Sequence, residues 1–310
     1  MWLIDLARKG LFMPTVRANG MTIAYDEVGR KDAEPLLLVS GLGVQMIRWD
    51  SSFCEMLAAE GYRVIRFDNR DVGLSTHLDD APVIEMDALA GTLGRGERPS
   101  LTYTLLDMAD DAVGLLDALG IEQAHVVGRS MGGMIAQSMA AEHPRRVLSM
   151  ASIMSTTGNP DLPPPSPEAM RALTRPAPNP AQDELGYLNH CVAAARVIAS
   201  PGFVFDEGAY RAQALAELRR AYNPAGFGRQ IAAMITGGDR RARLNTIVAP
   251  TLVAHGAADQ LIPAAGGRDT AASIKGSKLM IIDGMGHDLP IELHETFVLA
   301  IAGNAQRAAT

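Results

Sequence analysis

The sequence is poor in cysteine, in aromatic residues and in long hydrophobic runs. Only Cys54 and Cys191 occur among 310 residues, which excludes a disulfide framework. No group of cysteine and histidine residues has the spacing of a metal site, so no metal is expected. No apolar run approaches the roughly 18 residues that a transmembrane helix needs.

Basic clusters are also missing. The net charge is −7 and no block of five or more Lys or Arg residues occurs, so neither nucleic acid nor an anionic membrane is expected as a partner. Residues 1–12 carry Asp5 before the basic pair Arg8-Lys9, which does not fit a secretory signal. This segment is either an amphipathic helix on the body, a partner or a membrane surface, or a docked or frayed terminus. We expect a cytoplasmic monomer or homodimer that acts on a small molecule.

The chain does contain enough apolar residues for a large core. Apolar residues make up 47% and charged residues 20% of the chain, as in a globular protein. Strand and helix patterns alternate, which predicts a mostly parallel, eight-stranded sheet with helices on both faces. The expected strands are 16–18, 21–25 (a hairpin around Asn19-Gly20), 36–39, 62–67, 125–127, 147–153, 251–255 and 278–282. The expected helices are 49–60, 104–119 (with a capping box at Thr104 and Asp107), 131–142, 184–199, 207–221, 226–235, 264–274 and 289–302.

One region interrupts the alternation. Eight of the 18 prolines lie between Pro160 and Pro180, and no regular element is expected there. Only helical patterns follow until residue 236. We therefore predict a helical cap at 157–236, inserted into a core of 1–156 and 237–310. Residues 77–100 are expected to form a long loop with one helical turn near 83–89.

The pattern Gly128-x-Ser130-x-Gly132 lies between an expected strand and an expected helix. A serine on such a sharp turn projects its hydroxyl from the sheet, and the glycines permit the close backbone approach. The helix start supplies free N–H groups for an oxyanion. The alternative interpretation is an ordinary glycine-rich turn capped by serine.

Two further reactive side chains follow strands. Asp259 comes after the strand 251–255, and His287 comes after the strand 278–282. A serine hydroxyl needs an imidazole as base, and the imidazole needs a carboxylate to orient it. Ligands bind beyond the carboxyl ends of the strands of a parallel sheet. Ser130, Asp259 and His287 are therefore expected to meet there.

With these motifs the chain resembles an α/β-hydrolase-fold enzyme along nearly its whole length. The matching residues are Gly41, Asp68-x-Arg70-x-x-Gly73-x-Ser75, Gly128-x-Ser130-x-Gly132-Gly133, Gly256-x-x-Asp259 and Gly286-His287. Residues 69–75 and 103–105 are similar to those of the branch containing aclacinomycin methylesterase and related bacterial carboxylesterases.

The resemblance implies a role for each residue. Ser130 would be the nucleophile, His287 the general base and acid, and Asp259 its orienter. The backbone N–H groups of Leu42 and Met131 would form the oxyanion hole, and no cofactor is implied. This chain has Ser40-Gly41 where the family often has His-Gly, and Asp71 at a common glycine position. Asp68 and Arg70 are expected to tie loops together.

Other residues near the expected site have alternative interpretations. Arg129 is either a surface ion-pair residue or a ligand for a substrate carboxylate. His255 is expected to be a strand-end residue, and Asp283 and Asp288 are expected to be solvated. Histidines at 77, 125, 143, 190 and 294 are expected to be structural. The candidate pocket residues are Gly41, Gly43, Met46, Arg129, Met154 and Met285.

The best hypothesis is a serine esterase that cleaves carboxylic esters through an acyl-enzyme, with the cap and the 77–100 loop roofing the site. The same residues also fit lactone opening, C–C bond hydrolysis, amide cleavage or perhydrolysis. A non-catalytic receptor that uses the same pocket is a third hypothesis.

Overall fold

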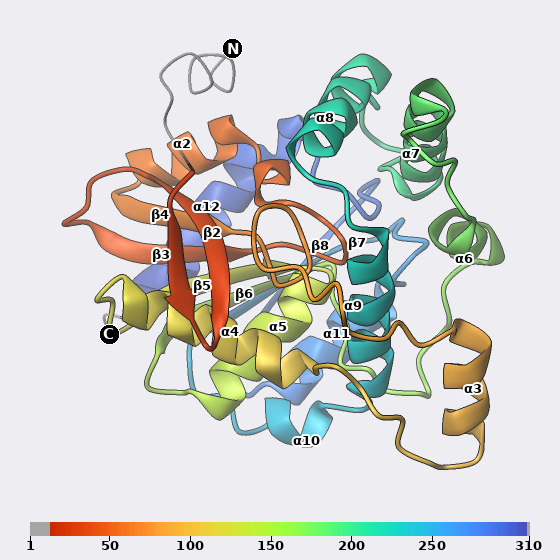
Figure 1. Cartoon of the computed structure of the whole chain (residues 1–310). Helices are drawn as coiled ribbons and strands as arrows, with labels where there is room; N and C mark the ends of the chain where they lie inside the picture. The colour runs from red at the N-terminus through yellow and green to blue at the C-terminus, as the bar shows by residue number, and fades with distance from the viewer. Residues whose placement is uncertain (1–12, 309–310) are drawn as a thin grey trace.

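The computed structural model describes residues 13–308, so the N-terminal segment 1–12, with both of its interpretations, lies outside the described residues. The strands are β1 (Thr15–Ala18), β2 (Met21–Val28), β3 (Glu34–Val39), β4 (Tyr62–Phe67), β5 (Ala124–Arg129), β6 (Val147–Ile153), β7 (Thr251–Gly256) and β8 (Lys278–Ile282). They form one sheet in the order β1-β2-β4-β3-β5-β6-β7-β8 (Figure 1). β2 is antiparallel to β1 and β4, and the pairs from β4 to β8 are parallel. The predicted eight-stranded, mostly parallel sheet is confirmed.

Helices cover both faces of this sheet. They are α2 (Ser51–Ala59), α3 (Met86–Gly94), α4 (Leu105–Ala118), α5 (Met131–Glu142), α6 (Pro167–Thr174), α7 (Glu184–Ile198), α8 (Glu207–Arg220), α9 (Pro224–Thr236), α10 (Arg241–Leu244), α11 (Ala265–Ser273) and α12 (His294–Ala305), with 3-10 turns at Met46–Arg48, Ile291–Leu293 and Gln306–Ala308. Val126 of β5 packs in a cluster with α4 and α5. Its neighbour Val127 packs in a second cluster with α2 and α12, because side chains alternate along a strand. Among residues 13–308 there is no helix with the length and hydropathy needed to span a bilayer.

Local signals in the sequence are confirmed where they are strongest. Asn19 and Gly20 have positive φ angles of 47° and 76° and join β1 to β2, as an Asn-Gly hairpin requires. The side chain of Thr104 accepts a hydrogen bond from the backbone of Asp107 and the reverse bond is also present, so α4 begins with the predicted capping box.

Three predictions of local structure are wrong. The proline-rich segment contains α6, because Ser166 caps the helix and Pro167 occupies its first turn, where a missing N–H costs nothing. The single turn expected near 83–89 is instead α3, a nine-residue helix. α12 begins at His294 rather than 289, because Pro290 and a 3-10 turn precede it.

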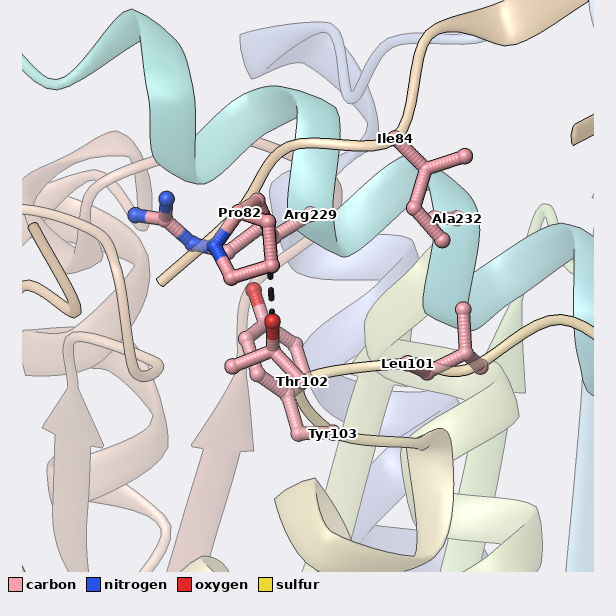
Figure 2. A pocket seen from close by; sticks show the side chains of 7 residues that line it. All are labelled: Pro82, Ile84, Leu101, Thr102, Tyr103, Arg229 and Ala232. Carbon is pink, nitrogen blue, oxygen red and sulfur yellow. Dashed lines mark hydrogen bonds between the residues drawn. The ribbon is translucent and has the colours of Figure 1, made fainter. Parts of the chain in front are cut away.

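The helices α6 to α9 lie between β6 and β7 in the chain, and we call them the helical insertion. Figure 1 shows α6, α7 and α8 outside the layers of sheet and helices. The bounds 157–236 stay a prediction. The segment from 82 to 103 packs against α9, and Figure 2 shows the side chains that line the hollow between them. The volume of this hollow is about 10 Å³, which is room for about one water molecule.

Candidate active site

Ser130 lies on a strained turn between β5 and α5. Its φ and ψ angles are 54° and −124°, a conformation that a residue with a side chain rarely adopts. A Cβ atom added to Gly132 would lie 2.2 Å from the carbonyl oxygen of Val39, and one added to Gly128 would lie 2.0 Å from that of Gly132. Both positions therefore require glycine, and the turn is the sharp strand-to-helix turn that the sequence pattern predicts.

The structure brings Ser130, His287 and Asp259 together in one chain of hydrogen bonds. Nε2 of His287 lies 3.0 Å from Oγ of Ser130. Its other ring nitrogen, Nδ1, lies 2.7 Å from Oδ2 of Asp259. The three side chains follow β5, β8 and β7 at the carboxyl ends of these strands, as expected for a ligand site on a parallel sheet.

Asp259 is held as a carboxylate by its surroundings. Its Oδ1 accepts hydrogen bonds from the backbone N–H groups of Leu261 and Ile262, at 2.9 and 2.8 Å. Burial alone would raise the pKa of Asp259, but the charge of His287 and hydrogen bonds from His255, His287 and Ile262 hold it well below its usual range. The side chain is thus ionised and fixed toward His287 at neutral pH.

His255 contributes more than a strand-end residue would. It is fully buried, its Nε2 donates to the carbonyl oxygen of Ile262 at 2.7 Å, and the same atom lies 3.3 Å from Oδ2 of Asp259. This contact braces the loop that presents Asp259. The only sequence signal for this contact is the spacing, because His255 and Asp259 are four residues apart across a turn.

The loop that carries His287 is fastened to the end of the helical insertion's α7. The backbone N–H of His287 donates to the carbonyl oxygen of Ile198 at 2.7 Å. Oγ of Ser200 accepts from the backbone of Gly286 at 2.8 Å and donates to Asp288. Burial raises the pKa of Asp288, and the residue is half-buried rather than fully solvated as expected. Asp283 is exposed, as predicted.

Two backbone N–H groups near Ser130 have no acceptor within residues 13–308. They belong to Leu42 and Met131. A Cβ atom added to Gly41 would lie 3.3 Å from Cβ of Ser130, so the loop after β3 passes directly beside the serine. The next residue, Gly43, donates its N–H to Oε1 of Gln230 at 2.8 Å. A buried glutamine of α9 therefore holds this loop, and nothing in the sequence pattern pointed to it.

Arg129 stacks on an aromatic ring. Its guanidinium carbon lies 4.8 Å from the ring centroid of Trp49, and the side chain is partly exposed. In the part of the chain that the structure describes it forms no ion pair, so the surface ion-pair interpretation is not supported.

The methionines predicted for the pocket are core residues. Met154 and Met285 pack in the same cluster as Trp49, and Met46 is fully buried. Their role in a substrate pocket stays a prediction, as does that of Gly41 and Gly43. A cleft of about 400 Å³ opens beside the loop of His287, between the end of α7 and Gln260. Its lining residues are Arg196, Val197, Ala199, Ser200, Pro201, Phe203, Phe205 and Gln260.

The motif around Asp68 ties the core to the helical insertion. Asp68 accepts hydrogen bonds from the backbone N–H groups of Met46 and Leu74 at 2.8 and 2.9 Å, and it forms a 2.6 Å ion pair with Arg220 of α8. Arg70 forms a buried ion pair with Asp111 of α4 at 2.6 Å. Both contacts agree with the structural roles expected for this motif.

The histidines expected to be structural lie away from this hydrogen-bonded chain. His125 is buried, with Nδ1 at 2.8 Å from Oγ of Ser149. His143 pairs with Asp110, and His77 contacts the carbonyl oxygen of Gly73. Within residues 13–308, no group of three or more His, Cys, Asp or Glu residues could hold a metal ion.

Comparisons with known proteins identify the fold family of the chain. Residues 34–196 match the family model of the alpha/beta hydrolase fold. The chain is 30% identical to the rhodomycin D methylesterase DauP of Streptomyces sp. (strain C5), over 96% of this chain and all of that protein. It is also 30% identical to the 2-hydroxy-6-oxononadienedioate/2-hydroxy-6-oxononatrienedioate hydrolase of Paraburkholderia xenovorans (strain LB400), over 88% of this chain and 86% of that protein. Among solved structures, the N-acyl homoserine lactone degrading enzyme Est816 superposes with a TM-score of 0.68 at 26% identity, covering 94% of this chain and 99% of that one.

Proposed function

Since the chain belongs to the α/β-hydrolase fold family, we propose that it hydrolyses carboxylic esters through an acyl-enzyme intermediate. The observation that carries this proposal is the position of His287, whose two ring nitrogens contact Ser130 at 3.0 Å and Asp259 at 2.7 Å. A neutral imidazole in this position accepts a proton at Nε2 while donating from Nδ1, which is what activation of a serine hydroxyl needs.

In the first half of the reaction, Oγ of Ser130 attacks the ester carbonyl and its proton passes to Nε2 of His287. Asp259 stabilises the resulting imidazolium. The N–H groups of Leu42 and Met131 receive the oxyanion, and each such donor typically stabilises the transition state by about 3 kcal/mol. His287 then donates the proton to the leaving alkoxide.

In the second half, a water molecule takes the place of the alcohol. His287 removes a proton from the water, and the hydroxide attacks the acyl carbon bound to Ser130. The acid leaves and the proton returns to Oγ. The helical insertion fits the role of a roof that limits access of water and selects the substrate, since α7 holds the loop of His287 and α9 holds the loop of Leu42.

A second candidate keeps the same residues and changes the bond that is cleaved. It is favoured by the relative named as an oxononadienedioate hydrolase and by the lactone-degrading structure. Rates on esters, lactones, carbamates and vinylogous diketo acids under one set of conditions separate these reactions. Esters are expected to be the fastest substrates, because the methylesterase is matched over 96% of this chain and the oxononadienedioate hydrolase over 88%.

The test is hydrolysis of p-nitrophenyl esters from acetate to decanoate by wild type and Ser130→Ala. We expect activity to fall about 10⁴-fold or more in the variant, since the nucleophile is lost. Ser138→Ala is the matched control, because Ser138 is a buried serine of α5, the helix that follows Ser130, and its Oγ donates to the carbonyl of Met134. Equal rates in wild type and Ser130→Ala would contradict the proposal.

A further inference from the structure

The side chain of Arg129 lies at the carboxyl edge of the sheet, one residue before Ser130. Arg129 ends β5, and strand alternation puts its side chain on the same face as Val127, toward α2. There its guanidinium covers the ring of Trp49. The residue is therefore a cation immediately beside the proposed nucleophile.

Two carboxylates, Glu217 and Asp288, act on Arg129 through their charge. Both are hydrogen-bonded to other residues. Glu217 of α8 is bound through both oxygens by Arg48. Asp288 accepts a hydrogen bond from Ser200. Neither forms an ion pair with Arg129 within the described chain.

The position is costly for an arginine without an anion. Burial, followed by the charge of Arg48, lowers the pKa of Arg129 to about 10, so the group is still protonated at neutral pH. Stacking on Trp49 engages the face of the guanidinium and leaves its in-plane N–H donors free. A half-buried cation with free donors is stabilised by an anion that fits the fork.

We propose that Arg129 binds a carboxylate of the substrate, so that preferred substrates are esters that also carry a free acid group. This inference rests on the proposed ester hydrolysis. A carboxylate fits because it is planar, matches the guanidinium in two parallel hydrogen bonds and carries one charge, as Arg129 does. The stack on Trp49 fixes the plane in which such a pair forms.

The experiment compares acidic esters with capped esters of equal length. The substrates are the mono-p-nitrophenyl esters of succinic, glutaric and adipic acid, each beside the same compound with its free acid converted to a methyl ester. For wild type we expect kcat/KM to be about 10- to 100-fold higher for the best acidic ester than for its capped partner. Arg129→Met should bring that ratio to about one, and Arg129→Lys should retain part of it.

The matched control is Arg30→Met. Arg30 is an exposed arginine paired with Asp32 in the turn before β3, at the opposite end of the sheet from Ser130. The Arg30→Met variant removes the same charge far from Ser130. Its ratio of kcat/KM for acidic over capped esters should therefore equal that of wild type. The wild-type ratio should also shrink as NaCl is raised, because salt screens the attraction. This measurement needs no variant and holds even if the Arg129 variants fail to fold.

The outcomes separate this inference from the proposed function. Ser130-dependent hydrolysis without any preference for the acidic ester overturns the role of Arg129 and leaves the esterase intact. A preference that persists in Arg129→Met also overturns it. If neither ester is cleaved, the esterase proposal fails. Titration of glutarate into the protein by calorimetry then decides: binding that is lost in Arg129→Met supports the anion site, and no binding to wild type overturns it.

Discussion

Two groups of polar side chains in the described part of the molecule differ in how they are built. The first is the chain of Ser130, His287 and Asp259 at the carboxyl ends of three strands. The second joins the helical insertion to the core through three ion pairs, which are Arg48–Glu217, Asp68–Arg220 and Asp71–Arg229. The first group is joined by side-chain hydrogen bonds through His287, whereas the second is joined by ion pairs between a carboxylate and an arginine.

The difference reflects what each group has to do. In the proposed reaction a proton moves between Ser130 and His287, and these side chains are joined by a hydrogen bond along which it can pass. The pairs at the helical insertion carry fixed charges on arginine, which stays protonated. Removing one partner of a buried ion pair leaves the other charge buried without compensation, which destabilises the fold. The three ion pairs that join the helical insertion to the core are therefore expected to govern stability. The group of Ser130, His287 and Asp259 is expected to govern activity.

The largest effect that tests this division is expected at Asp71. Both of its carboxylate oxygens bind Arg229 at 2.7 and 2.8 Å, and both side chains are buried. Asp71 has a φ of 68°, which asparagine also tolerates, so Asp71→Asn removes the charge without backbone strain. We expect the free energy of unfolding to fall by about 3 kcal/mol, measured by urea denaturation.

The matched control for Asp71→Asn is Asp32→Asn, which breaks the exposed pair with Arg30 and should leave unfolding unchanged. The double variant Asp71→Asn with Arg229→Gln should recover part of the loss, because no unpaired charge remains. If Asp71→Asn were as stable as wild type but inactive, the proposed division between the two groups would be wrong.

A smaller effect is expected at Gln230, which follows Arg229 in α9 and binds the loop of Leu42. Gln230 accepts from the N–H of Gly43 and donates to the carbonyl of Arg70, both at 2.8 Å. Gln230→Leu frees the loop that carries Leu42, so we expect kcat to fall about tenfold with KM little changed, because the oxyanion donor is used in the transition state. Steady-state kinetics on one p-nitrophenyl ester measure both constants.

A second buried glutamine supplies the comparison for this variant. Gln137 of α5 donates to Oγ of Ser152 at 3.1 Å, and within residues 13–308 its side chain forms no hydrogen bond with the Leu42 loop. Gln137→Leu should cost similar stability and leave kcat near wild type. Equal losses of kcat in both variants would mean that Gln230 acts only through general stability.

The same contrast explains what could be predicted from the sequence. The hairpin at Asn19-Gly20, the capping box at Thr104 and the elbow at Ser130 are set by local chemistry within a few residues. Their geometry therefore follows from the order of the residues. The helix α6 was missed because the density of prolines concealed the cap at Ser166 and the favourable placement of Pro167.

The ion pairs between the helical insertion and the core could not be predicted from the sequence, and the reason is physical. Arg229 and Asp71 are 158 residues apart, and a charged residue on a helix is usually solvated, so nothing local marks it as a buried partner. The same holds for Gln230. Ser200 and Asp288 are in contact because the loop of His287 lies against the end of α7. That arrangement depends on how the helical insertion packs and not on a sequence motif.

The smallest effect concerns acid, and it follows from the pKa of the two aspartates at the interface. For Asp71, burial favours the protonated form, but hydrogen bonds from Arg229 and the backbone N–H of Leu78 outweigh it and lower the pKa from 3.8. A carboxylate with a lowered pKa stabilises the fold above its unfolded pKa, and this contribution is lost as pH falls through the folded value. The stability gap between wild type and Asp71→Asn should therefore be constant near neutrality and shrink below about pH 4.

For Asp68, burial raises the pKa despite the charge of Arg220, so the gap in unfolding free energy between wild type and Asp68→Asn should widen as pH falls. Urea denaturation from pH 7 to pH 3 measures both gaps, and parallel curves for the two variants would show that the two pairs do not differ as these pKa shifts require.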